Sequence, residues 1–272
     1  MTAYRQEIAI WQQKRDAELR DPDGWLTLAG LFWLENGRSS FGAGPDNDLC
    51  FPDNAAPRLG EFVVTDESVV VEIASGVIVT CDGAEVTRLT VAGEGMDGPV
   101  LAYGSLRWFV IRRDDHWAVR LRDREHPALA AFHGVECFPV DRAWRLDAQL
   151  IPHPSPLTVA VPTILGSVNQ TPSPGVLHFS VNGEKQTLIA LSSAGHSLSL
   201  IFADATSGGE TYGSGRFLTV AAPDAEGWTA IDFNRAYNPP CAFTPFATCP
   251  LPPAGNRLAI PIPAGEKKYG DH

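Results

Sequence analysis

Hydrophobic residues near the N-terminus recur at the spacing of a helix. Charged residues separate the members of this apolar set, which are Tyr4, Ile8, Trp11 and Leu19. Residues spaced by three, four or eight positions share one face of a helix, and Asp21-Pro22 supplies a stop signal. We therefore expect a helix over residues 4–20.

A second apolar run covers residues 24–34 and is followed by Asn36-Gly37. That dipeptide is favoured in the type I′ turn of a two-residue hairpin. We interpret the run as a strand, a tight turn and a short return strand over residues 39–41. A helix over residues 25–34 is the competing interpretation, because an apolar run of about ten residues is ambiguous.

Beyond Phe41, short apolar runs alternate with turns rich in Gly, Asp and Asn. Candidate strands cover residues 61–64, 69–73, 76–81, 85–91, 105–112 and 117–122, with a turn at Asp82-Gly83. Separations of about ten residues between short strands are typical of a sandwich or a barrel.

A second series of strands follows the proline-rich stretch 152–174, which we expect to be mostly extended. These strands cover residues 176–181, 185–191, 197–202, 216–220 and 229–233, with a turn at Asn182-Gly183. Consecutive short strands joined by tight turns predict an antiparallel meander.

The pattern as a whole predicts an all-β, mainly antiparallel protein with three parts. They are an N-terminal helix (residues 1–22), a β-sandwich (residues 23–125) and a second β meander or barrel (residues 126–272) with a proline-rich C-terminal strip.

Composition and charge narrow the class of protein. The chain has 272 residues, 44% of them hydrophobic, so it can bury a core. Its 21 Lys and Arg stand against 32 Asp and Glu, a formal net charge of −11, which leaves no basic surface for a nucleic acid. Neither a signal peptide nor a membrane span is evident, and five cysteines, an odd number, suit a reducing compartment. We expect a soluble cytoplasmic protein that contacts neither nucleic acid nor membrane.

Familiar catalytic motifs are missing. Residues 93–98 match G-x-G-x-x-G, but Pro99 and a strand follow instead of a helix that could bind a pyrophosphate. We interpret this segment as a loop, so no nucleotide cofactor is indicated. Signatures of serine esterases, zincins and P-loop proteins are also lacking.

Residues 204–216 form the first segment with unusual chemistry. Four glycines in this segment allow close approach of the backbone to a ligand. Glu210, Tyr212 and Arg216 supply a base, a phenol and a fixed cation. The alternative is a long hairpin loop in which Asp204 and Thr206 cap local turns.

A second unusual segment begins at the end of the last expected strand. Asp232 and Asn234 alternate around Phe233, so both can point to one side. The polar residues Arg235, Tyr237 and Asn238 enter an extended segment that prolines keep rigid. We assign catalysis to Glu210, Tyr212 and Asp232 and substrate binding to Arg216, Asn234, Arg235, Tyr237 and Asn238.

Cys241 and Cys249 lie eight residues apart in this segment. With two further ligands they would bind zinc, and in an oxidising setting they would form a disulfide. Their spacing is not that of a C-x-x-C knuckle, so we expect partly buried thiols, with zinc as the weaker alternative and the cofactor unknown.

Several runs of the chain resemble a known bacterial family. They are ETYGSGRFL, DFNRAYNPPCAFTPFATCPLPP and NRLAIPIPAGEKKY, preceded by DPDGWLTLAGLFWLENG, FGAGPDND and FPVDRAWRL. Over nearly its whole length the chain resembles the longer members of the domain of unknown function sixteen eighty-four. Short members resemble only the part from about Phe138 onward, which implies that this half is the defining unit. The resemblance implies no established activity.

The first half has a weaker resemblance to forkhead-associated sandwiches, which bind phosphothreonine. It rests on FGAGPDNDLCFP, the strands that follow and Asp82-Gly83. In that family an arginine follows the first glycine, whereas here Ala43 follows Gly42, and residues 54–60 lack the Ser-x-x-His pair. The resemblance therefore implies a shared sandwich without phosphopeptide recognition.

Two hypotheses for function follow from these residues. The first is an enzyme of hydrolase or lyase type that acts on a small polar or anionic substrate at the 204–216 and 232–241 loops. Glu210 or Asp232 would be its base and Arg216 its anchor. The alternative is a non-catalytic ligand-binding or protein-interaction scaffold, in which Arg216 and Asp232 form a buried structural pair.

Overall fold

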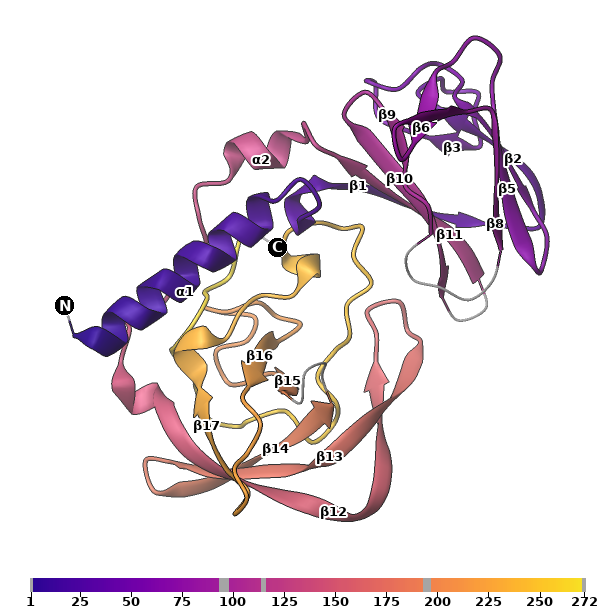
Figure 1. The fold of residues 1–272 in the computed structure, drawn as a ribbon. Helices are drawn as coiled ribbons and strands as arrows, with labels where there is room; N and C mark the ends of the chain where they lie inside the picture. Colours follow the sequence, from indigo (N-terminus) through magenta and orange to yellow (C-terminus); the bar gives the residue numbers. More distant parts are fainter. Residues whose placement is uncertain (1, 93–97, 114–115, 193–196, 271–272) are drawn as a thin grey trace. The chain divides into compact units, whose positions relative to one another are not determined.

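The computed structural model describes residues 2–92, 98–113, 116–192 and 197–270 (Figure 1). Contacts group the chain into two compact units. We call residues 19–132 the sandwich unit, and residues 1–18 with 133–272 the family-like unit. The domain boundaries expected from the sequence stay a prediction, and residues 93–97 of the glycine motif lie outside the described residues.

Helix α1 (Ala3–Arg20) confirms the helix expected at the N-terminus. Ile8 and Leu19 on its apolar face are buried, and Arg20 in the last turn complements the helix dipole. Within the described ranges, no helix is long and apolar enough to cross a membrane.

The sandwich unit consists of two sheets. One sheet has the order β1-β11-β10-β9-β6-β7, formed by Leu28–Leu34, His116–Asp123, Leu106–Arg113, Leu101–Tyr103, Val79–Cys81 and Ala84–Val86. The other has the order β3-β2-β4-β5-β8, formed by Leu49–Cys50, Gly37–Gly42, Gly60–Val64, Ser68–Ile73 and Arg88–Ala92. A short 3-10 turn, η1 (Trp25–Thr27), precedes β1, and helix α2 (Pro127–Ala131) follows β11. The short strands expected beyond Phe41 are confirmed, except that the strand expected over residues 85–91 is wrong: it is two strands, β7 and β8, which lie in different sheets.

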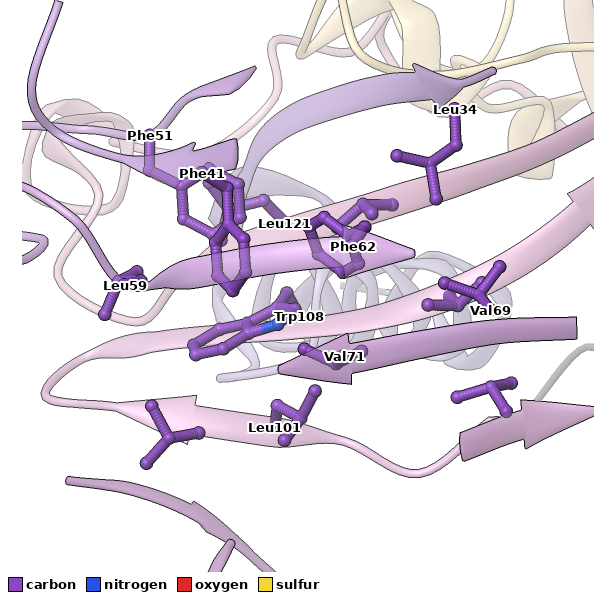
Figure 2. Close-up of a cluster of buried hydrophobic side chains, with 14 of the residues drawn as sticks. Leu34, Phe41, Phe51, Leu59, Phe62, Val69, Val71, Leu101, Trp108 and Leu121 are labelled. Atoms are coloured by element: carbon purple, nitrogen blue, oxygen red, sulfur yellow. The ribbon is translucent and has the colours of Figure 1, made fainter. Parts of the chain in front are cut away.

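Aromatic side chains fill the space between the two sheets. Figure 2 shows Phe41 and Phe62 from one sheet pointing toward Trp108 from the other. The ring centroids of Phe41 lie 4.4 Å from Phe62 and 5.9 Å from Trp108, and all three residues are fully buried. Such rings bury large apolar areas in favourable tilted pairs.

The hairpin predicted at Asn36-Gly37 is wrong. Strands β1 and β2 do form on either side of it, but they belong to different sheets, β1 with β11 and β2 with β4. A type I′ turn needs positive φ at both central residues. Only Gly37 has it, at +116°, so the chain crosses between sheets here.

The two other predicted turns have the required geometry. Asp82 and Gly83 have φ values of +50° and +80°, and Asn182 and Gly183 have +51° and +85°. Each turn joins an antiparallel pair, β6 to β7 and β13 to β14.

The family-like unit contains the predicted meander. Its sheet order is β16-β15-β14-β13-β12-β17. The strands are β12 (Arg145–Pro162), β13 (Val168–Val181), β14 (Glu184–Ser192), β15 (Leu198–Phe202), β16 (Arg216–Val220) and β17 (Trp228–Asp232). Strand β17 pairs with β12, and short 3-10 turns lie at Arg142–Trp144, Phe233–Arg235 and Pro240–Ala242.

The sheet of the family-like unit curls, and its free edge is covered by the chain that follows β17. Phe217 of β16 exchanges two backbone hydrogen bonds with Tyr237, with N···O distances of 2.8 and 2.9 Å. Residues 256–268, the C-terminal strip, pack Leu258, Ile262 and Ala264 on the core of this sheet. Edge strands need such cover.

The proline-rich stretch is extended, as expected, and most of it belongs to two strands. Strands β12 and β13 run through it as a long antiparallel pair, with a register shift between Pro152 and Leu157. Prolines cannot donate to a ladder, and the shift falls where three prolines alternate along β12, namely Pro152, Pro154 and Pro156.

Candidate functional site

Loop 204–216 is organised around Asp204. The Asp204 carboxylate accepts hydrogen bonds from the Thr206 backbone N–H (2.9 Å) and from the Thr206 hydroxyl (2.6 Å). This is the local turn cap expected if the segment is a long hairpin loop. Glu210 is exposed, and its carbonyl accepts the Lys268 N–H at 2.9 Å. Asp204 Oδ1 also accepts the Ile262 N–H at 3.1 Å, so the loop is bonded to the C-terminal strip through both a side chain and the backbone.

Arg216 is fully buried and bonded to protein groups. Its Nη2 donates to Asp204 Oδ2 and to the Ile262 carbonyl, both at 2.9 Å, while its Nη1 donates to the carbonyls of Ala264 and Glu266. Burial lowers its pKa, and Asp204 opposes that shift. These bonds hold the C-terminal strip against β16, and the ion-pair partner of Arg216 is Asp204 instead of Asp232, the partner in the scaffold hypothesis.

Segment 232–238 faces helix α1. The Tyr4 hydroxyl donates to Asp232 Oδ1 (2.8 Å) and accepts from Asn234 Nδ2 (2.9 Å). One helical turn further, Glu7 forms an ion pair with Arg235. Residues spaced by three or four positions on α1 thus contact successive polar residues of this segment.

The contact continues along α1 to Tyr237 and Asn238. The Tyr237 ring centroid lies 6.5 Å from that of Trp11 and 4.8 Å from the Arg15 guanidinium carbon. Arg15 Nη2 also donates to the Asn238 carbonyl at 3.1 Å. The four predicted binding residues of this segment, together with Asp232, therefore bind the chain's own helix.

Arg15 connects this contact to a buried carboxyl group. Its Nε donates to Glu266 Oε1 at 3.2 Å, and the Asn238 N–H donates to Glu266 Oε2 at 2.6 Å. Only 1% of Glu266 is exposed. Burial raises the pKa of Glu266, and nearby Asp16 adds to the rise, which outweighs the opposing effects of Arg15 and Asn238.

Glu266 lines a pocket of about 350 Å³ between α1 and residues 135–137. The other lining residues are Ala9, Gln12, Gln13, Arg15, Asp16, Val135 and Cys137. Asp16 Oδ1 accepts the Val135 N–H at 3.3 Å. Gly134 has a φ of +107°, and a Cβ there would lie 2.9 Å from Asp16 Oδ2, so glycine permits this approach.

The thiol in this pocket, that of Cys137, has a raised pKa. Burial raises the pKa of Cys137 to about 12, and the neighbouring Glu266 and Asp16 carboxyl groups contribute to the rise. A thiol in such surroundings stays protonated at neutral pH.

Tyr212 contacts Cys241, which in turn contacts Cys249. Its hydroxyl donates to the Cys241 carbonyl at 3.0 Å, and the Cys241 N–H donates to Cys249 Sγ at 3.1 Å. Hydrogen bonding from Cys249 lowers the pKa of Cys241 to about 7, and Tyr212 contributes, while burial opposes the shift. No disulfide joins the two. Among the residues that the structure describes, no three His, Cys, Asp or Glu side chains are grouped to bind a metal.

The sequence interpretation missed the pocket residues Arg15, Asp16 and Glu266. Glu266 does lie in NRLAIPIPAGEKKY, one of the runs that carry the family resemblance. Arg15 is four residues beyond Trp11 on the face of α1 that contacts segment 232–238. The sequence therefore contains a signal for each residue, but the contact between Arg15 and Glu266 joins positions 251 residues apart, and no local sequence pattern predicts such a contact.

The chain matches the model of a protein family whose function is unknown. A family model described as "Protein of unknown function (DUF1684)" matches residues 130–267, in line with the resemblance of the C-terminal half. An uncharacterized protein of Haloarcula marismortui, solved by NMR, is 29% identical, covering 53% of this chain and 80% of its own, with a TM-score of 0.44. No curated protein matches the chain.

Two structures of FHA domains are also similar to part of the chain. One is the FhaA FHA domain complexed with the intracellular domain of Rv3910, and the other is described under phosphothreonine-dependent FHA domain interactions. Each is 19% identical and covers 34% of this chain, with a TM-score of 0.23. The match spans 97% and 92% of their own chains.

Proposed function

The chain belongs to the DUF1684 family of proteins of unknown function, and we propose that it binds a small polar ligand with a cationic group in the Glu266 pocket. The observation that carries the proposal is a buried carboxyl group with a raised pKa beside a second carboxyl group in a pocket. Strongly shifted groups in clefts mark functional sites more often than chance.

The charges around the pocket favour a cation over an anion. Asp16 and Glu266 supply two carboxyl groups, and Arg15 is the single basic residue among those that line it. Arg15 donates to Glu266 and to the Asn238 carbonyl, and its guanidinium lies over Tyr237, so it serves the fold. A cationic ligand would balance the excess carboxylate.

The size and the remaining lining fit a small molecule. A volume of about 350 Å³ lies within the range of ligand pockets, roughly 300–1,000 Å³. Gln12 and Gln13 add amide groups that both donate and accept hydrogen bonds. Cys137 is protonated, so the lining offers recognition and no activated thiol.

Calorimetric titration of the full chain with agmatine tests this proposal. We expect saturable binding to the wild type, weakened at least about tenfold by Glu266→Gln or Asp16→Asn, because each removes a partner of the cation. Glu18→Gln, an exposed carboxyl group on the same helix, is the matched control. Proton release on binding should be larger for the wild type than for Glu266→Gln, since a cation lowers a raised carboxyl pKa.

Two outcomes of this titration would contradict the proposed cation site. If agmatine does not bind, or if Glu266→Gln binds it as tightly as the wild type does, then this pocket is not a cation site. Circular dichroism of each variant separates loss of binding from loss of fold.

A second candidate function, an enzyme, is favoured by one observation at the predicted catalytic residue Tyr212. Its neighbour Cys241 is half-buried and has a pKa of about 7, so a substantial fraction is thiolate at neutral pH. Thiolates are the nucleophiles of covalent acyl transfer. Cys241 would attack an ester or thioester carbonyl and release the alcohol or thiol, and water would then hydrolyse the acyl-enzyme, the hydrolase type of chemistry.

Titration with p-nitrophenyl acetate distinguishes the enzyme from the binding protein. We expect a burst of one nitrophenolate per chain whose rate rises through about pH 7, and its loss in Cys241→Ser. Cys81→Ser is the control, because burial raises the pKa of that thiol. An unchanged burst in Cys241→Ser would rule out this nucleophile.

A further inference from the structure

Two arginines face each other across strands β10 and β11 of the sandwich unit. Arg107 is the register partner of Arg122. Directly opposed residues of an antiparallel pair have Cβ atoms about 4.5–5.5 Å apart, and like charges there are destabilising. Leu106 and Trp108 point into the core and are fully buried, so Arg107 projects from the outer face.

Within the described part of the chain, neither guanidinium lies within ion-pair distance of a carboxylate. Arg107 Nη1 donates to the carbonyls of Gly104 (2.8 Å) and Leu106 (2.7 Å). Arg122 Nη1 donates to the Gly24 carbonyl (2.5 Å) and to Thr27 Oγ1 (3.1 Å). These neutral acceptors orient the two side chains, and the favourable charges that act on them, Asp23 on both and Asp21 on Arg122, lie beyond ion-pair distance.

A third arginine adds to the positive charge. Arg124 lines the same pocket and forms an exposed ion pair with Asp23 at 3.2 Å. Burial lowers the pKa of both Arg107 and Arg122, and repulsion by Arg124 adds to the effect on Arg107, while Asp23 opposes the shift of both pKa values and Asp21 opposes that of Arg122. Asp23 and Asp82 are the acidic residues of the lining, two carboxylates against three guanidinium groups.

The arginines surround a pocket of about 530 Å³ with an apolar wall. Phe109, the next outward residue on β10 after Arg107, and Val100, which is 43% exposed, supply that wall. Residues 42–60, where the forkhead-associated resemblance lacks its arginine, contribute nothing to the lining. The pocket is therefore distinct from that segment.

We propose that this pocket binds a small organic anion, whose phosphate or carboxylate group lies between Arg107 and Arg122 and whose apolar part packs on Phe109. An oxyanion between two opposed guanidinium groups converts their repulsion into charge-assisted hydrogen bonds. The inference concerns the sandwich unit and stands independently of the Glu266 pocket.

Calorimetry on the full chain at fixed ionic strength tests the proposal with three probes: inorganic phosphate, phenyl phosphate and benzoate. We expect phenyl phosphate to bind at least about fivefold more tightly than inorganic phosphate, because only it contacts the apolar wall. Arg107→Gln should weaken phenyl phosphate at least about tenfold, and Arg124→Gln severalfold. Arg58→Gln, at an exposed arginine that does not line the pocket, is the control and should change nothing.

The benzoate titration distinguishes the two anionic groups. Binding of benzoate as tight as that of phenyl phosphate assigns a carboxylate, and much weaker binding assigns a phosphate. The proposal is overturned if none of the three probes binds beyond the effect of sodium chloride, or if Arg107→Gln binds them as the wild type does.

Melting temperatures provide a readout that a purely structural arginine would not reproduce. Without an anion, Arg107→Gln should melt at or above the wild-type temperature, because it removes a like-charge contact. With phenyl phosphate, the wild type should rise and the variant should not. A variant that melts well below the wild type in anion-free buffer would show instead that Arg107 holds the fold, and would overturn the proposal.

Discussion

Arg216 brings a positive charge into the interior of the family-like unit, where its side chain and that of Asp204 are fully buried. The pair is stabilising only while both partners are present, since an unpaired buried charge is strongly unfavourable. The remaining hydrogen bonds of Arg216 go to carbonyls of the C-terminal strip. At the residue scale, the charged Arg216 side chain therefore holds the C-terminal strip in place.

Arg216→Ala should therefore lower the free energy of unfolding by about 3–5 kcal/mol, because it leaves Asp204 buried without its partner. Urea unfolding followed by circular dichroism measures this. Arg257→Ala, at an exposed arginine of the C-terminal strip, should change it by less than about 0.5 kcal/mol. Equal effects of the two substitutions would show that the buried pair contributes little.

The raised pKa of Glu266 sets a pH dependence with a defined sign. A carboxyl group whose pKa is higher in the folded state binds more protons there, so its contribution to stability is present below about pH 4.5, its ordinary pKa, and is lost as pH rises through the folded value. The difference in unfolding free energy between the wild type and Glu266→Gln should thus fall from pH 4 to pH 8. A difference that grows with pH would show a lowered pKa.

At the scale of elements, α1 is bonded to segment 232–238 by residues on successive turns. Tyr4→Phe removes the hydroxyl that bridges Asp232 and Asn234 and should lower the unfolding free energy by about 1–2 kcal/mol. Ile10→Ala, on the exposed side of the helix, should have an effect below about 0.5 kcal/mol. Chemical denaturation compares the two, and a neutral Tyr4→Phe would mean that this contact does not hold the helix.

The type I′ turn between β13 and β14 allows a test of backbone conformation alone. Gly183 has a φ of +85°, and a Cβ there would meet nothing within 4 Å, so Gly183→Ala should be destabilised by about 1 kcal/mol through φ only. Gly209 is a suitable control because it has no positive φ and its added Cβ would make ordinary contact with the Thr206 carbonyl. Thermal unfolding should leave Gly209→Ala unchanged, and a neutral Gly183→Ala would contradict this description of the turn.

Elements with a local signature were predictable from the sequence. Helix α1 and the turns at Asp82-Gly83 and Asn182-Gly183 follow from periodicity and from turn chemistry. The hairpin at Asn36-Gly37 was not, because the choice between pairing β1 with β2 or with β11 is made by core packing. The same limit applies to the site, since the bonds of Glu266 to Arg15 and Asn238 join distant segments.

At the scale of the whole molecule, two pockets with opposite charge preference lie in different units. The carboxyl groups of Asp16 and Glu266 line the pocket of the family-like unit, and arginines line that of the sandwich unit. The family match covers residues 130–267, so the arginine pocket lies outside it, while Glu266 lies inside. The chain has a net charge of −11, so its surface as a whole repels anions. The arginine cluster is a local region of the opposite charge.

Chemical-shift mapping on the isotope-labelled full chain tests this account most directly. Agmatine should shift backbone amides near residues 12–16, 135–137 and 266 and leave the sandwich unit unchanged. Phenyl phosphate should shift amides near residues 100–109 and 122–124 and leave the family-like unit unchanged. Shifts from both probes in one unit, or shifts in neither pocket, would contradict the assignment of two sites of opposite charge.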